Sequence, residues 1–108
     1  MLIETSILLL LQESMRGLPK QIHYFPRMFA LSKTGSIRVY DITVEDMGNH
    51  AVMTTRKKVT LNGKWTEDKY DYWEGVNIGK SNETTYLEQA LSEAQSAWNR
   101  LQDAGFTV

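Results

Sequence analysis

Residues 37–45, with the sequence IRVYDITVE, predict the longest strand of the chain. Six of these nine residues are β-branched or aromatic, and such residues favour strands. The apolar positions change phase between Val39 and Tyr40. This change indicates either a β-bulge or a strand that is covered on both faces.

Turn signals on both sides of this strand predict its neighbours. Lys33–Ser36 contains the glycine of a hairpin turn, residues 46–49 form a second turn, and residues 61–64 contain the strong Asn-Gly hairpin signal. These connections are too short for parallel crossovers, so the strands form an antiparallel meander. About four strands are predicted, at residues 27–32, 37–45, 50–60 and 65–73. Residues 19–26, bracketed by two prolines, are expected to be an extended connector.

A single long helix follows the predicted meander. Thr85 and Glu88 have the spacing of a capping box, which marks a helix start. Gly105 suits the position just beyond the helix end, and Phe106 can fold back on the last turn. Apolar residues recur at helical spacing and predict a face buried against the sheet, opposite Ile42 and Val44. These residues are Leu87, Leu91, Ala94, Trp98 and Leu101.

Residues 1–18 are predicted to form a separate amphipathic helix that stops at Gly17. An isolated helix of this length is marginal in water, so its apolar stripe should lie in an interface. The interface is either with the rest of the domain or with a second copy or a partner protein. The stripe that we expect there contains Ile3, Ile7, Leu10 and Leu11.

The same N-terminal stretch lacks the features of a targeting or membrane segment. Glu4 and Glu13 interrupt the apolar residues, whereas a membrane span needs about 20 of them. No base precedes the apolar stretch, as a signal peptide would require. We therefore expect a cytoplasmic protein that does not enter a membrane.

Composition restricts the possible chemistry. The chain has 108 residues, which suits one α+β domain of residues 27–108 behind the N-terminal helix and connector. It has no cysteine and two histidines, so disulfides, thiolate metal sites and a cysteine nucleophile are excluded. No nucleophile and base can be paired in the sequence. We expect no catalysis, no metal and no cofactor.

Residues 75–81, GVNIGKS, resemble a nucleotide phosphate loop, but three residues separate the glycines where the Walker motif has four. No buried parallel strand precedes them either, so nucleotide hydrolysis is not expected. A weaker anion site is still possible, because Lys80 lies just before the start of a helix. The alternative is a loop that only leads into the helix and caps it.

Charge is divided unevenly along the chain. From Arg16 to Lys64 there are nine bases and three acids, whereas Trp65 to Val108 contains three bases and eight acids. A basic face attracts phosphate through long-range steering and counterion release. The alternative is two solvated faces that pair across the fold.

The order of elements and three segments resemble the WGR domain in its phage type. The segments are GSIRVYDI at 35–42, NIGKSNETT at 77–85 and the helix at 88–98, and the resemblance covers about residues 27–108. WGR domains bind DNA in poly(ADP-ribose) polymerases, and related domains precede catalytic modules in viral and phage proteins such as DNA ligases. The resemblance therefore implies that the protein binds DNA and that it is located in a phage-infected bacterial cell. Where the family has Trp-Gly-Arg-Val, this chain has Arg56-Lys57-Lys58-Val59.

Two functions follow from the sequence. The first is a non-catalytic module that binds DNA phosphates independently of base sequence. Its contacts would come from a basic strand and from the start of the helix, through Arg38, Arg56, Lys57, Lys58, Lys64 and Lys80. Strand alternation places Arg56 and Lys58 on one face and Lys57 on the other. The second is a small interaction module or enzyme inhibitor, phage-encoded if the resemblance holds, that docks through the N-terminal helix or the acidic half.

Overall fold

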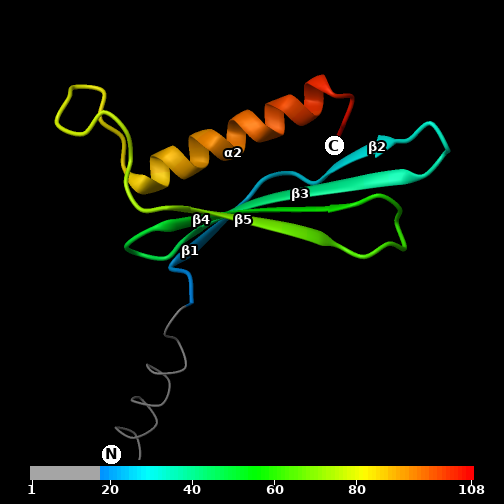
Figure 1. Ribbon diagram of the computed structural model, residues 1–108, viewed down its shortest axis with the longest axis horizontal. Coiled ribbons are helices and arrows are strands. Elements are labelled where there is room, and N and C mark those ends of the chain that lie inside the picture. The colour runs from blue at the N-terminus through cyan, green and yellow to red at the C-terminus, as the bar shows by residue number, and fades with distance from the viewer. Residues whose placement is uncertain (1–17) are drawn as a thin grey trace, which may run out of the picture.

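The computed structural model describes residues 18–108 as a five-stranded antiparallel sheet with one helix lying across one of its faces (Figure 1). This arrangement confirms the α+β class and the C-terminal helix. The N-terminal helix expected at residues 1–18, with its apolar stripe, lies outside the described residues except for Leu18. The elements are β1 (Gln21–Tyr24), β2 (Met28–Leu31), β3 (Ile37–Asp46), β4 (Ala51–Lys58), β5 (Thr66–Tyr72) and α2 (Tyr86–Asp103).

Strand β3 organises the sheet because it pairs with three other strands. The strand order is β1-β3-β4-β5, and β2 also pairs with β3. Along one edge of β3, β1 pairs with Thr43–Asp46 and β2 pairs with Ile37–Tyr40. Pairing with β4 on the other edge is continuous from Val39 to Asp46, so the change of apolar phase is not a bulge.

The structure corrects the connector expected at residues 19–26 and the count of about four strands. Gln21–Tyr24 form a fifth strand, β1, that is hydrogen-bonded to β3. The flanking prolines keep this segment extended, as expected. Extended backbone needs partners for its N–H and C=O groups, and the half of the β3 edge that β2 leaves open supplies them.

Small residues bring helix α2 close to the sheet. Ala90 and Ala94 are fully buried and pack against the sheet side chains Ile42 and Val44. The larger side chains of the predicted stripe flank these alanines and are only partly buried: Leu87, Leu91, Trp98 and Leu101. The predicted helix face is therefore right, and its fully buried centre is Ala90 and Ala94. A close approach of helix to sheet leaves no room for bulky residues along the contact line.

Both ends of α2 are closed by the predicted local motifs. Thr85 Oγ1 accepts a hydrogen bond from the Glu88 amide, and the Glu88 carboxylate accepts one from the Thr85 amide, which completes the capping box. At the other end Gly105 has a φ of 98°, and the Phe106 amide donates to the Leu101 carbonyl. This Schellman geometry turns Phe106 back into the core, where it is buried.

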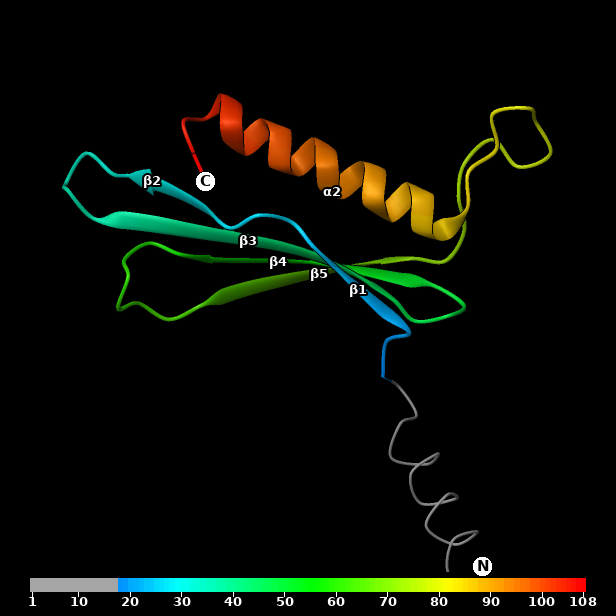
Figure 2. The same cartoon turned by 180° about the vertical axis from the view of Figure 1, so that it is seen from behind.

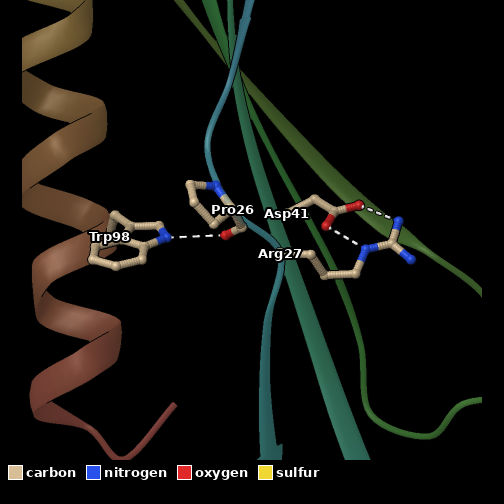
Figure 3. Close-up of polar contacts among 4 residues, drawn as sticks. All are labelled: Pro26, Arg27, Asp41 and Trp98. Atoms are coloured by element: carbon tan, nitrogen blue, oxygen red, sulfur yellow. Dashed lines mark hydrogen bonds and ion pairs between the residues drawn. The ribbon is translucent and has the colours of Figure 1, made fainter. Parts of the chain in front are cut away.

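A second tie joins the helix to the segment between β1 and β2. The indole N–H of Trp98 donates a hydrogen bond of 3.0 Å to the Pro26 carbonyl (Figure 3). Proline cannot donate, but its carbonyl is available because residues 25–27 run between two strands. Trp98 therefore anchors this crossing segment to the helix by one directional bond as well as by packing.

The opposite end of α2 is tied to the turn between β3 and β4. Asp46 Oδ1 accepts hydrogen bonds from the Tyr86 hydroxyl at 2.7 Å and from the Gly48 amide at 2.9 Å. These bonds favour the carboxylate form and hold the pKa of Asp46 below its ordinary value, with Tyr86 the larger cause. The same bond raises the pKa of Tyr86.

Replacing Trp98 should destabilise the fold. We expect Trp98→Ala to lower the free energy of unfolding by about 3 kcal/mol, since it removes a large aromatic contact from the helix–sheet boundary. Trp98→Phe keeps most of the packing but removes the N–H donor, so about 1 kcal/mol is expected. Urea unfolding monitored by circular dichroism measures both values. Equal destabilisation by the two substitutions would contradict the packing role assigned to the ring.

The Asp46 hydrogen bonds predict a specific sensitivity to acid. A carboxyl with a depressed folded pKa stabilises the fold above its unfolded pKa of about 3.9, and this contribution disappears as pH falls through the folded pKa. Asp46→Asn should therefore flatten the dependence of stability on pH below about 4. Tyr86→Phe should flatten it partly, because the Gly48 amide still donates. Thermal melts from pH 7 to pH 2.5 test this, and an unchanged slope in Asp46→Asn would refute it.

Candidate nucleic-acid interface

Strand register separates the basic residues of β4 as the sequence predicted. Ile42 and Val44 of β3 face the helix, and their β4 partners are Thr55 and Met53. Side chains alternate between faces, so Arg56 and Lys58 lie on the face opposite α2 and Lys57 lies on the helix side. We call the face opposite α2 the helix-free face, since no other element within residues 18–108 covers it.

Three cations gather around one indole on the helix-free face. The Arg56 guanidinium carbon lies 4.4 Å from the centroid of the Trp65 ring, and the Lys58 ammonium lies 4.5 Å from it. The guanidinium of Arg27 lies 5.2 Å from the same ring. These are cation–π distances, which are favourable because the faces of an aromatic ring are electron-rich. We call Trp65, Arg27, Arg56 and Lys58 the Trp65 cluster.

An ion pair fixes one member of the Trp65 cluster. Arg27 donates from Nε and Nη2 to the two carboxylate oxygens of Asp41, each at 2.7 Å (Figure 3). The hydrogen bonds to Asp41 raise the pKa of Arg27, and the attraction between the two charges adds to this. The pair is parallel and bidentate, a geometry that restrains the guanidinium plane. Arg27 remains half exposed, so its other donors face solvent.

A cleft of about 320 Å³ lies beside this ion pair. Its charged wall is formed by Arg27, Asp41 and Arg56, and Thr43 adds a hydroxyl. Tyr24 of strand β1 forms another side and is 74% exposed. The cleft therefore combines donors, acceptors and an exposed aromatic side chain on one surface.

Two other basic residues of the predicted site, Arg38 and Lys64, are not members of the Trp65 cluster. Arg38 extends from the helix side, with its guanidinium 5.5 Å from the Phe106 ring. It lines a second cleft, of about 400 Å³, between the two hairpin turns. Lys64 lies in the turn between β4 and β5, and Lys58 donates to the Leu61 carbonyl in that turn.

The hairpin turns at residues 32–36 and 59–65 project from the same end of the sheet, which we call the hairpin end (Figure 2). Residues 27–42 and 55–68, which the strand register places at this end, contain seven basic and three acidic residues. The remaining described residues contain four basic and eight acidic residues. The uneven charge along the sequence therefore becomes a separation of charge along the sheet.

Lys80 lies apart from the other basic residues of the predicted site. It lies in the loop between β5 and α2, which projects from the end of the molecule opposite the hairpin turns (Figure 1). Two amides of this region already donate to carboxylates: Gly79 donates to Glu83 at 3.3 Å, and Thr85 donates to Glu88. Two carboxylates near the helix start disfavour a bound anion there.

A close contact with the Thr84 backbone explains Gly75, the first glycine of the segment that resembles a phosphate loop. A Cβ at Gly75 would lie 1.7 Å from the Thr84 carbonyl oxygen, so only glycine fits where the loop closes. The loop is closed by two hydrogen bonds between Val76 and Thr84. The structure thus accounts for Gly75 through packing of the loop, without a phosphate.

Sequence reasoning missed four residues of this surface: Tyr24, Arg27, Asp41 and Trp65. Arg27 and Asp41 are separated by 14 positions and meet only because β2 pairs with β3. Trp65 precedes β5, and its position facing Arg56 and Lys58 follows from pairing between β4 and β5. The alternation of aromatic residues from Trp65 to Trp73 was the one available signal.

Within residues 18–108, no group of histidine and acidic side chains could hold a metal ion. None of the helices described there combines the length and the apolar character needed to cross a membrane.

No family model matches this chain, and comparisons with curated proteins and with solved structures likewise found no match. The resemblance to the WGR domain therefore stays a prediction from the sequence.

Proposed function

We propose that the protein is a non-catalytic nucleic-acid-binding module that contacts phosphates through the helix-free face of its hairpin end. The observation that carries the proposal is the Trp65 cluster, in which three cations of the helix-free face surround one indole. Contacts of this kind position a protein on a nucleic-acid backbone without reading base sequence.

Like charges repel, so a cluster of three cations is costly in the absence of an anion. Here the ring of Trp65 and the carboxylates of Asp41 and Glu67, which are the cross-strand partners of Arg56, reduce that cost. Two carboxylates do not neutralise three cations. A phosphodiester backbone carries one negative charge per nucleotide and would relieve the repulsion that remains. The cluster also holds long side chains in place before binding, which lowers the entropic cost of association.

The distribution of charge over residues 18–108 supports the same surface. Basic residues outnumber acidic residues at the hairpin end, and acidic residues outnumber basic residues in the rest of the described chain. An approaching polyanion is therefore attracted to one end and repelled from the other, and such steering orients an encounter. The proposed surface comprises the Trp65 cluster together with Lys64 of the adjoining turn between β4 and β5. It omits Lys80, whose loop between β5 and α2 lies at the opposite end of the molecule (Figure 1).

The alternative is an interaction module that docks on another protein through residues 1–18 or through its acidic half. The acidic charge of the loop end is its support in the described structure. This alternative becomes the better account if the chain binds no nucleic acid at low salt.

Charge reversal on the helix-free face should weaken nucleic-acid binding. We expect the double variant Arg56→Glu, Lys58→Glu to bind a 20-base-pair duplex and a single strand at least tenfold more weakly at 50 mM salt. The slope of log K against log salt should also fall by about 0.9 for each duplex phosphate that the variant no longer neutralises, and by about 0.7 for each phosphate of a single strand. Fluorescence anisotropy of labelled oligonucleotides measures both quantities.

The matched control is the double variant Lys57→Glu, Lys80→Glu, which has the same net charge but changes residues off the proposed surface. It should retain most of the affinity. Equal weakening in the two double variants would show that total charge, rather than the Trp65 cluster, controls binding. Urea unfolding of both variants checks that each is folded under the binding conditions.

A further inference from the structure

We infer that the helix-free face binds single-stranded nucleic acid in preference to a duplex, with one unpaired base in the cleft beside Tyr24. The inference rests on the proposed function and specifies the substrate class of the same surface. Its parts are the cleft, the exposed ring of Tyr24 and the cations of the Trp65 cluster.

The helix-free face is too broad to enter a groove of a DNA duplex. The major groove is about 12 Å wide and admits a helix or a two-stranded ribbon. Strand register instead places Arg56 and Lys58 on the broad face of the sheet that is opposite α2. Helix α2 covers only the other face (Figure 1). A single strand has no groove to enter and can lie across an open sheet, as in other single-strand-binding proteins that use sheet surfaces.

The chemistry of the cleft suits the exposed edge of a base. Each Asp41 oxygen already accepts one bond from Arg27 and keeps a further lone pair, and the Thr43 hydroxyl adds an acceptor. Arg56 and the remaining N–H groups of Arg27 supply donors. The edge of an unpaired base presents both donors and acceptors, whereas in a duplex these groups are largely engaged by pairing. The cleft volume of about 320 Å³ lies at the small end of the usual range for ligand sites.

Tyr24 supplies the stacking surface that a base requires. Its side chain is 74% exposed on strand β1, although aromatic residues are usually largely buried. Trp65 is less suited to this role, because three cations already surround its ring. We therefore assign stacking to Tyr24 and phosphate contacts to Arg56 and Lys58.

The two roles are joined by Arg27. Its side chain lines the cleft with Tyr24 and also lies over the Trp65 ring. Tyr24 belongs to β1 at one edge of the sheet, and Trp65 precedes β5 at the other. A single-stranded nucleic acid that runs from the Tyr24 ring to the Trp65 ring must pass over the guanidiniums of Arg27 and Arg56. These two side chains are the base and phosphate contacts proposed here.

The test compares four probes with the full chain at one salt concentration. They are a labelled oligothymidylate, an oligouridylate, a duplex of the same length and an abasic oligonucleotide with the same number of phosphates. Anisotropy should show the thymidylate binding at least tenfold more tightly than the duplex or the abasic strand. If oligouridylate binds as tightly as oligothymidylate, the site accepts both RNA and DNA. If one of the two binds more tightly, that nucleic acid is the substrate.

Two substitutions at Tyr24 isolate the stacking role. Tyr24→Ala should weaken thymidylate binding roughly tenfold and leave duplex and abasic binding unchanged, because it removes the ring but no charge. Tyr24→Phe should bind like the native chain, since it keeps the ring. The side chain is exposed, so both variants should unfold at the same urea concentration as the native chain.

The outcomes separate the inference from the function on which it rests. Duplex or abasic binding as tight as thymidylate binding, or no effect of Tyr24→Ala, would overturn the single-strand inference and leave phosphate binding intact. Failure of all four probes to bind at low salt would overturn both.

Discussion

The crossing between β1 and β2 is the constraint on which the helix, the sheet edge and the candidate site all depend. On one side of this segment the Pro26 carbonyl accepts the indole N–H of Trp98, and on the other Arg27 pairs with Asp41 (Figure 3). Neighbouring residues thus join the helix layer to the helix-free face. Because β1 and β2 share one edge of β3, the position of this crossing also determines where Tyr24 and Arg27 lie.

The two faces of the sheet are stabilised by different physical effects. On the helix side, Ala90 and Ala94 let α2 approach closely, and burial of apolar surface dominates. On the helix-free face, order comes from an ion pair and from cations placed around one ring. Interactions of the second kind weaken with salt and still allow polar partners to approach. A surface ordered in this way can exchange its internal contacts for contacts with an anion.

The charge separation and the cleft have distinct consequences for the proposed binding. The basic hairpin end provides attraction that depends on net charge and acts over a distance set by salt. The cleft and the exposed ring of Tyr24 act only in contact and depend on shape. Binding strength and discrimination between nucleic-acid forms therefore arise from different residues of one face.

Elements with local causes can be predicted from the amino-acid sequence alone. The capping box at Thr85 and Glu88, the glycine turn after α2 and the hairpin turns depend on residues a few positions apart. Strand alternation likewise placed Arg56 and Lys58 together and Lys57 apart. Features that depend on pairing between distant segments become visible only in the folded chain. They are the edge strand β1, the pair of Arg27 with Asp41, the cations around Trp65 and the alanine centre of the helix contact. Spacing along the chain carries no signal for such contacts, because they form only when β3 is paired along both of its edges.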